Sequence, residues 1–163
     1  MAAVLQYLRW EMLLAAVPGT VGFSVSALCK MPSSDAIPFR PPAWVFGVVW
    51  PILYALLGIA WFRTAVAFGV ISFRSASYLL TTLVLCSWQV VYSCRKDVKN
   101  AVFVLLASVL SVAFNVALSN SPERLMLIPL LVWVSFATLM NAYQTTTLNP
   151  GRSRSANIYI SVA

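Results

Sequence analysis

The stretch PPAWVFGVVWPILY, residues 41–54, decides the fold that we expect for the whole chain. Two prolines precede a run that holds two tryptophans, a phenylalanine and a tyrosine but no charged side chain. Proline interrupts a regular helix, so the run predicts a helix that begins at about Trp44 and continues to about Phe68. An apolar helix of this length can cross the hydrocarbon core of a bilayer.

The composition extends this interpretation to the rest of the chain. Of 163 residues, 61% are hydrophobic and 9% are charged, with a mean hydropathy of +0.85. Soluble domains carry about 25% charged residues, so this chain has too little polar surface to face water on all sides. The net charge of +7 comes from basic residues that flank apolar runs. This is typical of membrane helices. We therefore expect lipid as a partner and no nucleic acid.

The apolar runs predict an all-α membrane protein, a bundle of five transmembrane helices at about 4–28, 44–68, 77–93, 100–118 and 124–146. They form one domain over residues 1–149, followed by a polar tail at 150–163. The longest connection, residues 29–42, contains four prolines. The other connections are short, which makes consecutive helices antiparallel neighbours.

The distribution of basic residues predicts the orientation. Seven of them lie on the side of the first loop and the C-terminus, against four on the other side. The positive-inside rule then places the first loop and the C-terminus in the cytosol. The three cysteines, Cys29, Cys86 and Cys94, are odd in number and lack the spacing of metal ligands. This pattern predicts free thiols rather than a disulfide framework or a zinc site.

Aromatic residues recur at helical spacing on three of the expected spans. Phe46, Trp50 and Tyr54 share one face of the second span, and Trp88 and Tyr92 share one face of the third. Trp133, Ala137 and Asn141 share one face of the fifth. Trp50 and Trp133 lie roughly 9–12 Å inside their spans at 1.5 Å per residue. Rings at this depth either fill the bundle or line a cavity for a flat apolar ligand.

Two asparagines, Asn115 and Asn141, lie within the expected spans. Either could cap a buried backbone gap or bond across helices, and a structural role is favoured. Asn141 has the better claim to a ligand, because it shares a face with Trp133. We expect the rings of Trp50 and Trp133 to bound one slot-shaped void beneath the proline-rich loop.

The residue inventory limits the chemistry. The chain has no histidine; three of its four acids lie outside the expected spans, and the fourth, Glu11, lies near the start of the first. Ion coupling, metal binding and general acid–base catalysis would need such groups. We therefore predict no catalytic residues, no metal and no required cofactor, which leaves a binding site for an apolar molecule.

Two segments resemble a known family. The pattern PPxWVFxxxWxxLYxxxGxA, at residues 41–60, and the segment PLLVWVSFATLMNAY, at 129–143, resemble the tryptophan-rich sensory protein / translocator protein family, TspO, once called the peripheral benzodiazepine receptor. The resemblance implies a five-helix bundle, often dimeric, with a pocket under the first loop. In this family the pocket binds porphyrins such as protoporphyrin or haem, and in animal members cholesterol. The implied ligand-binding residues are Phe46, Trp50, Tyr54, Trp88, Trp133, Ala137 and Asn141.

The sequence departs from the family pattern in places. Leu85 stands where the third helix usually has an asparagine, so a polar contact to the ligand is missing there. The proposed sterol motif needs a basic residue close to Tyr143, and the next one is Arg152, so sterol recognition by that route is not supported.

Three functions remain open: a receptor or carrier for porphyrin-like or other apolar polycyclic ligands, a light-dependent porphyrin-degrading enzyme, and a structural assembly protein. Family members occupy the mitochondrial outer membrane, plant endomembranes or bacterial envelopes, and no signal in the sequence selects one.

Overall fold

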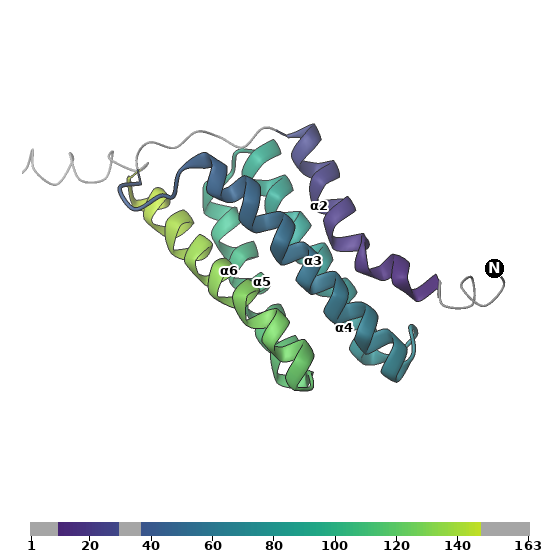
Figure 1. The fold of residues 1–163 in the computed structure, drawn as a ribbon. Coiled ribbons are helices and arrows are strands. Elements are labelled where there is room, and N and C mark those ends of the chain that lie inside the picture. Colours follow the sequence, from purple (N-terminus) through teal and green to yellow (C-terminus); the bar gives the residue numbers. More distant parts are fainter. Residues whose placement is uncertain (1–9, 30–36, 148–163) are drawn as a thin grey trace, which may run out of the picture.

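The computed structural model describes residues 10–29 and 37–147, and every regular element in these ranges is helical. The elements in chain order are the 3-10 helix η1 (Trp10–Ala15), α2 (Val17–Leu28), α3 (Ala43–Phe68), α4 (Phe73–Gln89), the π-helical turn η2 (Val90–Cys94), α5 (Val98–Leu118) and α6 (Ser121–Thr147) (Figure 1). The expected polar tail at 150–163 lies outside the described residues, as do parts of the first span and first loop.

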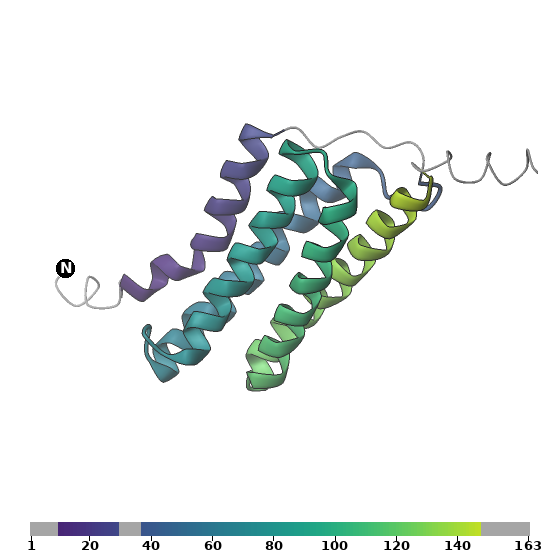
Figure 2. The same cartoon turned by 180° about the vertical axis from the view of Figure 1, so that it is seen from behind.

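The helices form one elongated bundle of antiparallel neighbours. Helix α3 packs against α2, α4 and α6, while α5 packs between α4 and α6. Helix α2 lies along one edge of the bundle, and Figure 2 shows α4 and α5 on the face behind α3. We call the end where α2 stops and α3 begins the loop end. The opposite end, where α3 turns into α4 and α5 into α6, is the far end.

Four of these helices are long and apolar enough to cross a membrane: α3, α4 with η2, α5 and α6. They correspond to the second to fifth predicted spans, whose boundaries were right to within about four residues. Large apolar side chains such as Leu83, Leu110 and Leu139 point outward and are more than half exposed. The residues facing inward include Leu57, Leu85 and Leu105 and are fully buried. An apolar outer surface of this kind identifies a multi-pass membrane protein.

The first predicted span differs from the expectation of one continuous helix over 4–28. In the described part, η1 ends at Ala15 and α2 begins at Val17. Pro18 explains the break, because proline fits the first turn of a helix but not its interior. The six residues of η1 at about 2.0 Å each and the twelve of α2 at about 1.5 Å each add up to roughly 30 Å.

The cysteine prediction was wrong for two residues. Cys29 and Cys94, 65 positions apart, form a disulfide, whereas Cys86 is free and buried. Cys29 follows the last residue of α2, and Cys94 is the last residue of η2. The packing of α2 beside η2 brings the two ends together, and sequence spacing carries no trace of that packing.

Candidate functional site

A column of aromatic rings runs through the loop-end half of the bundle. Tyr54 stacks on Trp50 with ring centroids 5.4 Å apart, and Trp50 stacks on Trp88, also at 5.4 Å. Trp88 in turn stacks on Tyr92 at 5.7 Å. All four side chains are at least 94% buried. Helices α3 and α4 with η2 therefore share a continuous ring stack, built from the stripes that the helical spacing predicted.

The fifth span joins this column from the side. The ring of Trp133 meets that of Trp50 edge-on, with centroids 6.4 Å apart, and meets that of Phe46 at 5.6 Å. The prediction that Trp50 and Trp133 converge was right. The prediction of an open slot between them was wrong, because the two rings touch. The open volume lies on other sides of the Trp50 ring.

Two hollows flank the ring column. The larger, of about 260 Å³, lies between α2 and α3 and is lined by Gly22, Phe23, Ser26, Phe46, Gly47, Trp50, Pro51, Tyr54 and Gln89. The smaller, of about 20 Å³, lies towards α6 and is lined by Ile37, Arg40, Phe46, Trp88, Tyr92, Ala137, Met140, Asn141 and Gln144. Phe46 lines both hollows and is half-buried. Its ring therefore forms part of the wall between them.

Polar atoms without partners are concentrated around these hollows. In the part of the chain that the structure describes, six buried side-chain nitrogen or oxygen atoms have no hydrogen-bond partner: Trp50 Nε1, Tyr54 OH, Trp88 Nε1, Gln89 Oε1, Trp133 Nε1 and Asn141 Oδ1. Leaving a buried donor or acceptor unsatisfied costs about 1–3 kcal/mol. A cluster of such atoms is therefore expected where a ligand completes the hydrogen bonds.

Comparison with known proteins agrees with this arrangement. The sequence model of the TspO/MBR family matches residues 12–146. The chain belongs to this family. It is 29% identical over 147 aligned residues to the "Tryptophan-rich protein TspO" of Chlorobaculum tepidum, an alignment that covers 80% of this chain and 89% of that protein.

In this TspO/MBR chain the predicted ligand-binding residues are brought together at the loop end. Phe46, Trp50 and Tyr54 line the larger hollow, and Phe46, Trp88, Ala137 and Asn141 line the smaller one. Trp133 lines neither and reaches them only through its contacts with Phe46 and Trp50. Whether these residues bind a ligand stays a prediction.

Sequence reasoning missed several lining residues. Gln89, directly after Trp88, supplies a side-chain amide in α4. The family pattern would place an asparagine amide one helical turn earlier, at the position that Leu85 occupies here. Gln144 accepts a hydrogen bond from the Tyr92 hydroxyl at 3.0 Å. Both are amides within apolar spans, which is the signal that would have identified them. Gly22 and Ser26 also line the larger hollow, and their place in its wall depends on how α2 lies against α3.

The described part of the first loop covers the smaller hollow. Ile37 is 6% exposed and lines it, together with Arg40. The guanidinium carbon of Arg40 lies 5.5 Å from the ring centroid of Phe46. The ring of Phe39 contacts Tyr143 at 5.3 Å and thereby holds this segment against α6.

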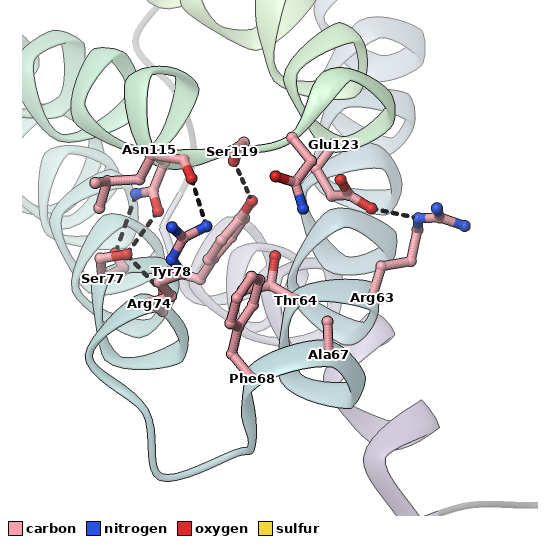
Figure 3. A pocket seen from close by; sticks show the side chains of 12 residues that line it. Arg63, Thr64, Ala67, Phe68, Arg74, Ser77, Tyr78, Asn115, Ser119 and Glu123 are labelled. Carbon is pink, nitrogen blue, oxygen red and sulfur yellow. Dashed lines mark hydrogen bonds and ion pairs between the residues drawn. The ribbon is translucent and has the colours of Figure 1, made fainter.

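A second polar cluster lies at the far end (Figure 3). Asn115 accepts a hydrogen bond from Ser77 Oγ at 2.7 Å and donates to Thr81 Oγ1 at 2.8 Å, which joins α5 to α4. Tyr78 and Ser119 share a hydrogen bond at 2.9 Å, and Figure 3 shows the phenol ring aimed at that serine. The enclosed volume is about 20 Å³, enough for one water molecule. This cluster is structural, as expected for Asn115.

Proposed function

We propose that this TspO/MBR protein is a membrane receptor or carrier that binds a porphyrin-like or other apolar polycyclic ligand beside the Trp50 ring. The observation that carries the proposal is a cluster of six unsatisfied buried polar atoms: five belong to residues that line two adjoining hollows, and the sixth belongs to Trp133, whose ring contacts Phe46 and Trp50. Five of the six belong to residues that the sequence predicted as ligand-binding. Ring faces supply stacking surface, and the indole N–H groups supply donors for carbonyl or carboxylate oxygens.

The size of the hollows constrains how the ligand is bound. Pockets for drug-sized ligands have volumes of about 300–1,000 Å³. The larger hollow, at about 260 Å³, suits a bicyclic or tricyclic ring system or one edge of a tetrapyrrole. A whole porphyrin needs both hollows, and rotation of the shared Phe46 ring would join them. Arg40, at the rim of the smaller hollow, matches the carboxylates that a porphyrin carries at its edge.

The same proposal includes the membrane topology. Helices η1 and α2 together have the length of a bilayer core and would complete a fifth span. At the far end Arg63, Arg74 and Arg124 all bond to acceptors within the protein. At the loop end three exposed cations lie close together, Arg95 and Lys96 in the α4–α5 turn and Lys99 in the first turn of α5. This asymmetry supports a cytosolic loop end.

Titration of the purified full chain with protoporphyrin tests the proposal. The readouts are the porphyrin absorption band and tryptophan fluorescence. We expect saturable binding that weakens by at least about tenfold in Trp50→Phe, equivalent to about 1.4 kcal/mol. Trp61→Phe is the matched control: this tryptophan is on the same helix and 4% exposed, but its Nε1 already donates to Ser75 Oγ at 2.7 Å. Absent saturation, or equal losses in both variants, would refute the pocket.

The ring column favours a second candidate function, light-dependent degradation of the bound porphyrin. Four tyrosine and tryptophan rings, each stacked within about 6 Å of the next, offer a path for an electron to reach an excited ligand. Illumination of the complex in air and under nitrogen tests this candidate. Enzymatic degradation predicts catalytic loss of porphyrin that needs oxygen and slows in Trp88→Phe. Simple bleaching would proceed at the same rate in that variant.

The structural alternative makes a different prediction. If the rings only pack, Trp50→Phe lowers the thermal unfolding temperature and does not weaken porphyrin binding beyond that loss of stability. If the Trp50 ring lines a binding site, the substitution weakens porphyrin binding more than it lowers stability. Comparing the two losses for Trp50 and Trp61 in the same detergent separates the alternatives.

A further inference from the structure

We propose that the Cys29–Cys94 disulfide is a redox-operated clamp that holds the loop-end half of α2 as one wall of the larger hollow, and that a dithiol reductant opens it. The bond joins the end of α2 to the end of η2. The bond thereby links α2 to the turn that continues from α4, and both α2 and α4 contribute residues to the wall of the hollow. Gly22, Phe23 and Ser26 line it from α2, and Gln89 lines it from α4, just before η2.

Noncovalent contacts hold α2 weakly. Only Pro18 and Gly22 of its twelve residues are buried. Within the described ranges, Gln89 Nε2 of α4 donates a hydrogen bond to Ser26 Oγ of α2 at the long distance of 3.3 Å. Leu28, the last residue of the helix, is 84% exposed. The covalent bond is therefore the strongest link between the loop end of α2 and the bundle.

The other end of α2 is anchored differently. A Cβ atom added to Gly58 of α3 would lie 2.0 Å from the carbonyl oxygen of Ala15, so the backbone of η1 approaches α3 directly. Similarly, a Cβ atom on Gly22 would lie 2.6 Å from the ring of Tyr54. When the disulfide opens, these close contacts keep the far half of α2 in place. Movement is then confined to the segment that follows Gly22, up to Cys29, which carries Phe23 and Ser26 of the wall.

The chemistry of opening is thiol–disulfide exchange. A thiolate of the dithiol attacks the exposed Cys94 sulfur, forms a mixed disulfide and displaces Cys29 as a thiolate, which takes up a proton. The second thiol of the reductant then displaces Cys94 and leaves as the oxidised, cyclic disulfide. The protein gains two electrons and two protons, and the dithiol loses both. Cys86 is buried in α4 and takes no part.

The proposed orientation gives the clamp a regulatory meaning. It places the loop end in the cytosol, where thiol reductants keep most cysteines reduced and where the disulfides that do form are usually transient and catalytic or redox-sensing. The wall would then be released under reducing conditions and fixed under oxidation. The clamp itself is a property of the chain and needs neither this orientation nor a bound ligand.

Hydrogen exchange read by mass spectrometry tests the clamp on the full chain in detergent. After reduction with dithiothreitol, we expect amide exchange over residues 22–28 to accelerate by at least about tenfold, while exchange in α5 stays within about twofold. Oxidation with glutathione disulfide should restore the slow rates. Cys29→Ser and Cys94→Ser should exchange rapidly with or without reductant, and Cys86→Ser should behave like the parent chain.

The same measurements can overturn the proposal. Equal exchange over residues 22–28 in the oxidised and reduced protein would show that the bond does not hold this wall. Three thiols alkylated in the non-reduced protein would show that the bond is absent. An acceleration that spreads equally to α5 would mean general unfolding rather than release of one wall. Porphyrin binding is not a readout here, so failure of the proposed function leaves this test intact.

Discussion

The indole ring of Trp133 meets the ring of Trp50 edge-on, with centroids 6.4 Å apart and planes at 83°. This contact joins α6 to α3 inside the bundle and fills the space that sequence reasoning had left for a ligand. The open volume lies instead on the α2 side of Trp50 and beneath Ile37. Residues of the same type are therefore expected to respond differently to substitution, depending on whether they line a hollow or lie in packed structure.

The two intramembrane asparagines are expected to behave in opposite ways. Asn115 makes hydrogen bonds with both its side-chain atoms, so Asn115→Ala should destabilise the protein by about 2 kcal/mol, the sum of several interhelical bonds of about 0.6 kcal/mol each and lost packing. Asn141 donates to its own helix, and its Oδ1 has no partner. Asn141→Ala should therefore change stability little and weaken porphyrin binding. Thermal unfolding in detergent and porphyrin titration of both variants check this. Equal stability losses would contradict it.

Two glycines of α3 provide a matched test of the η1 contact. In Gly58→Ala the new methyl would overlap the Ala15 carbonyl, which is backbone and cannot rotate away. We expect a loss of about 1–3 kcal/mol. Gly47→Ala meets nothing within 4 Å and should gain up to about 1 kcal/mol from the lower flexibility of the unfolded chain. Unfolding temperatures of the two variants provide the measurement. A neutral Gly58→Ala would mean that η1 does not pack against α3 as described.

Removing either member of the ion pair at the far end should lower stability by a different amount. Arg63 Nε lies 2.6 Å from Glu123 Oε1, with 47% of the arginine side chain exposed but 10% of the glutamate side chain. Arg63→Gln leaves a buried carboxylate without its cation and should cost about 1–2 kcal/mol, less than for a fully buried pair. Glu123→Gln lets the exposed arginine hydrate and should cost under about 1 kcal/mol. Chemical or thermal unfolding in detergent measures both, and the reverse order would refute the burial argument.

Asp97 should make stability depend on acid pH. Its carboxylate caps α5 by accepting the backbone N–H of Asn100 at 3.1 Å, and it also accepts the side-chain amide of Asn100 at 2.6 Å. These bonds, that to the backbone first, lower the pKa of Asp97. A pKa lowered in the folded state means that the stabilisation is complete above the unfolded pKa of about 3.9 and is lost as pH falls through the folded value.

The measurement is the unfolding temperature between neutral pH and pH 2, compared with Asp97→Asn. The asparagine of the variant can still cap α5 but does not titrate. The unfolding temperature of the variant should therefore fall less between neutral pH and pH 2 than that of the parent chain. Identical pH profiles for the two proteins would rule out this role.

Much of the fold followed from the amino-acid pattern. Helices α3 to α6 were predicted within a few residues, because runs of about 20 apolar residues have one stable conformation in lipid. The burial of Trp50, Tyr54, Trp88 and Tyr92 followed from spacing, since residues three and four apart share a helix face. The π-helical turn Val90–Cys94 was not predicted, because its extra residue per turn leaves no sign in the hydrophobic pattern.

The sequence alone determined that this chain is a helical membrane protein and that its deep aromatic residues face inward, since both depend on composition and local periodicity. The motifs at 41–60 and 129–143 added the resemblance to the TspO/MBR family. Only the tertiary structure decided where the hollows lie, that Trp133 closes the expected slot, and that Cys29 meets Cys94. These features depend on how helices distant in sequence are offset and rotated against one another. Packing of whole surfaces sets that arrangement, and no single stretch of residues encodes it.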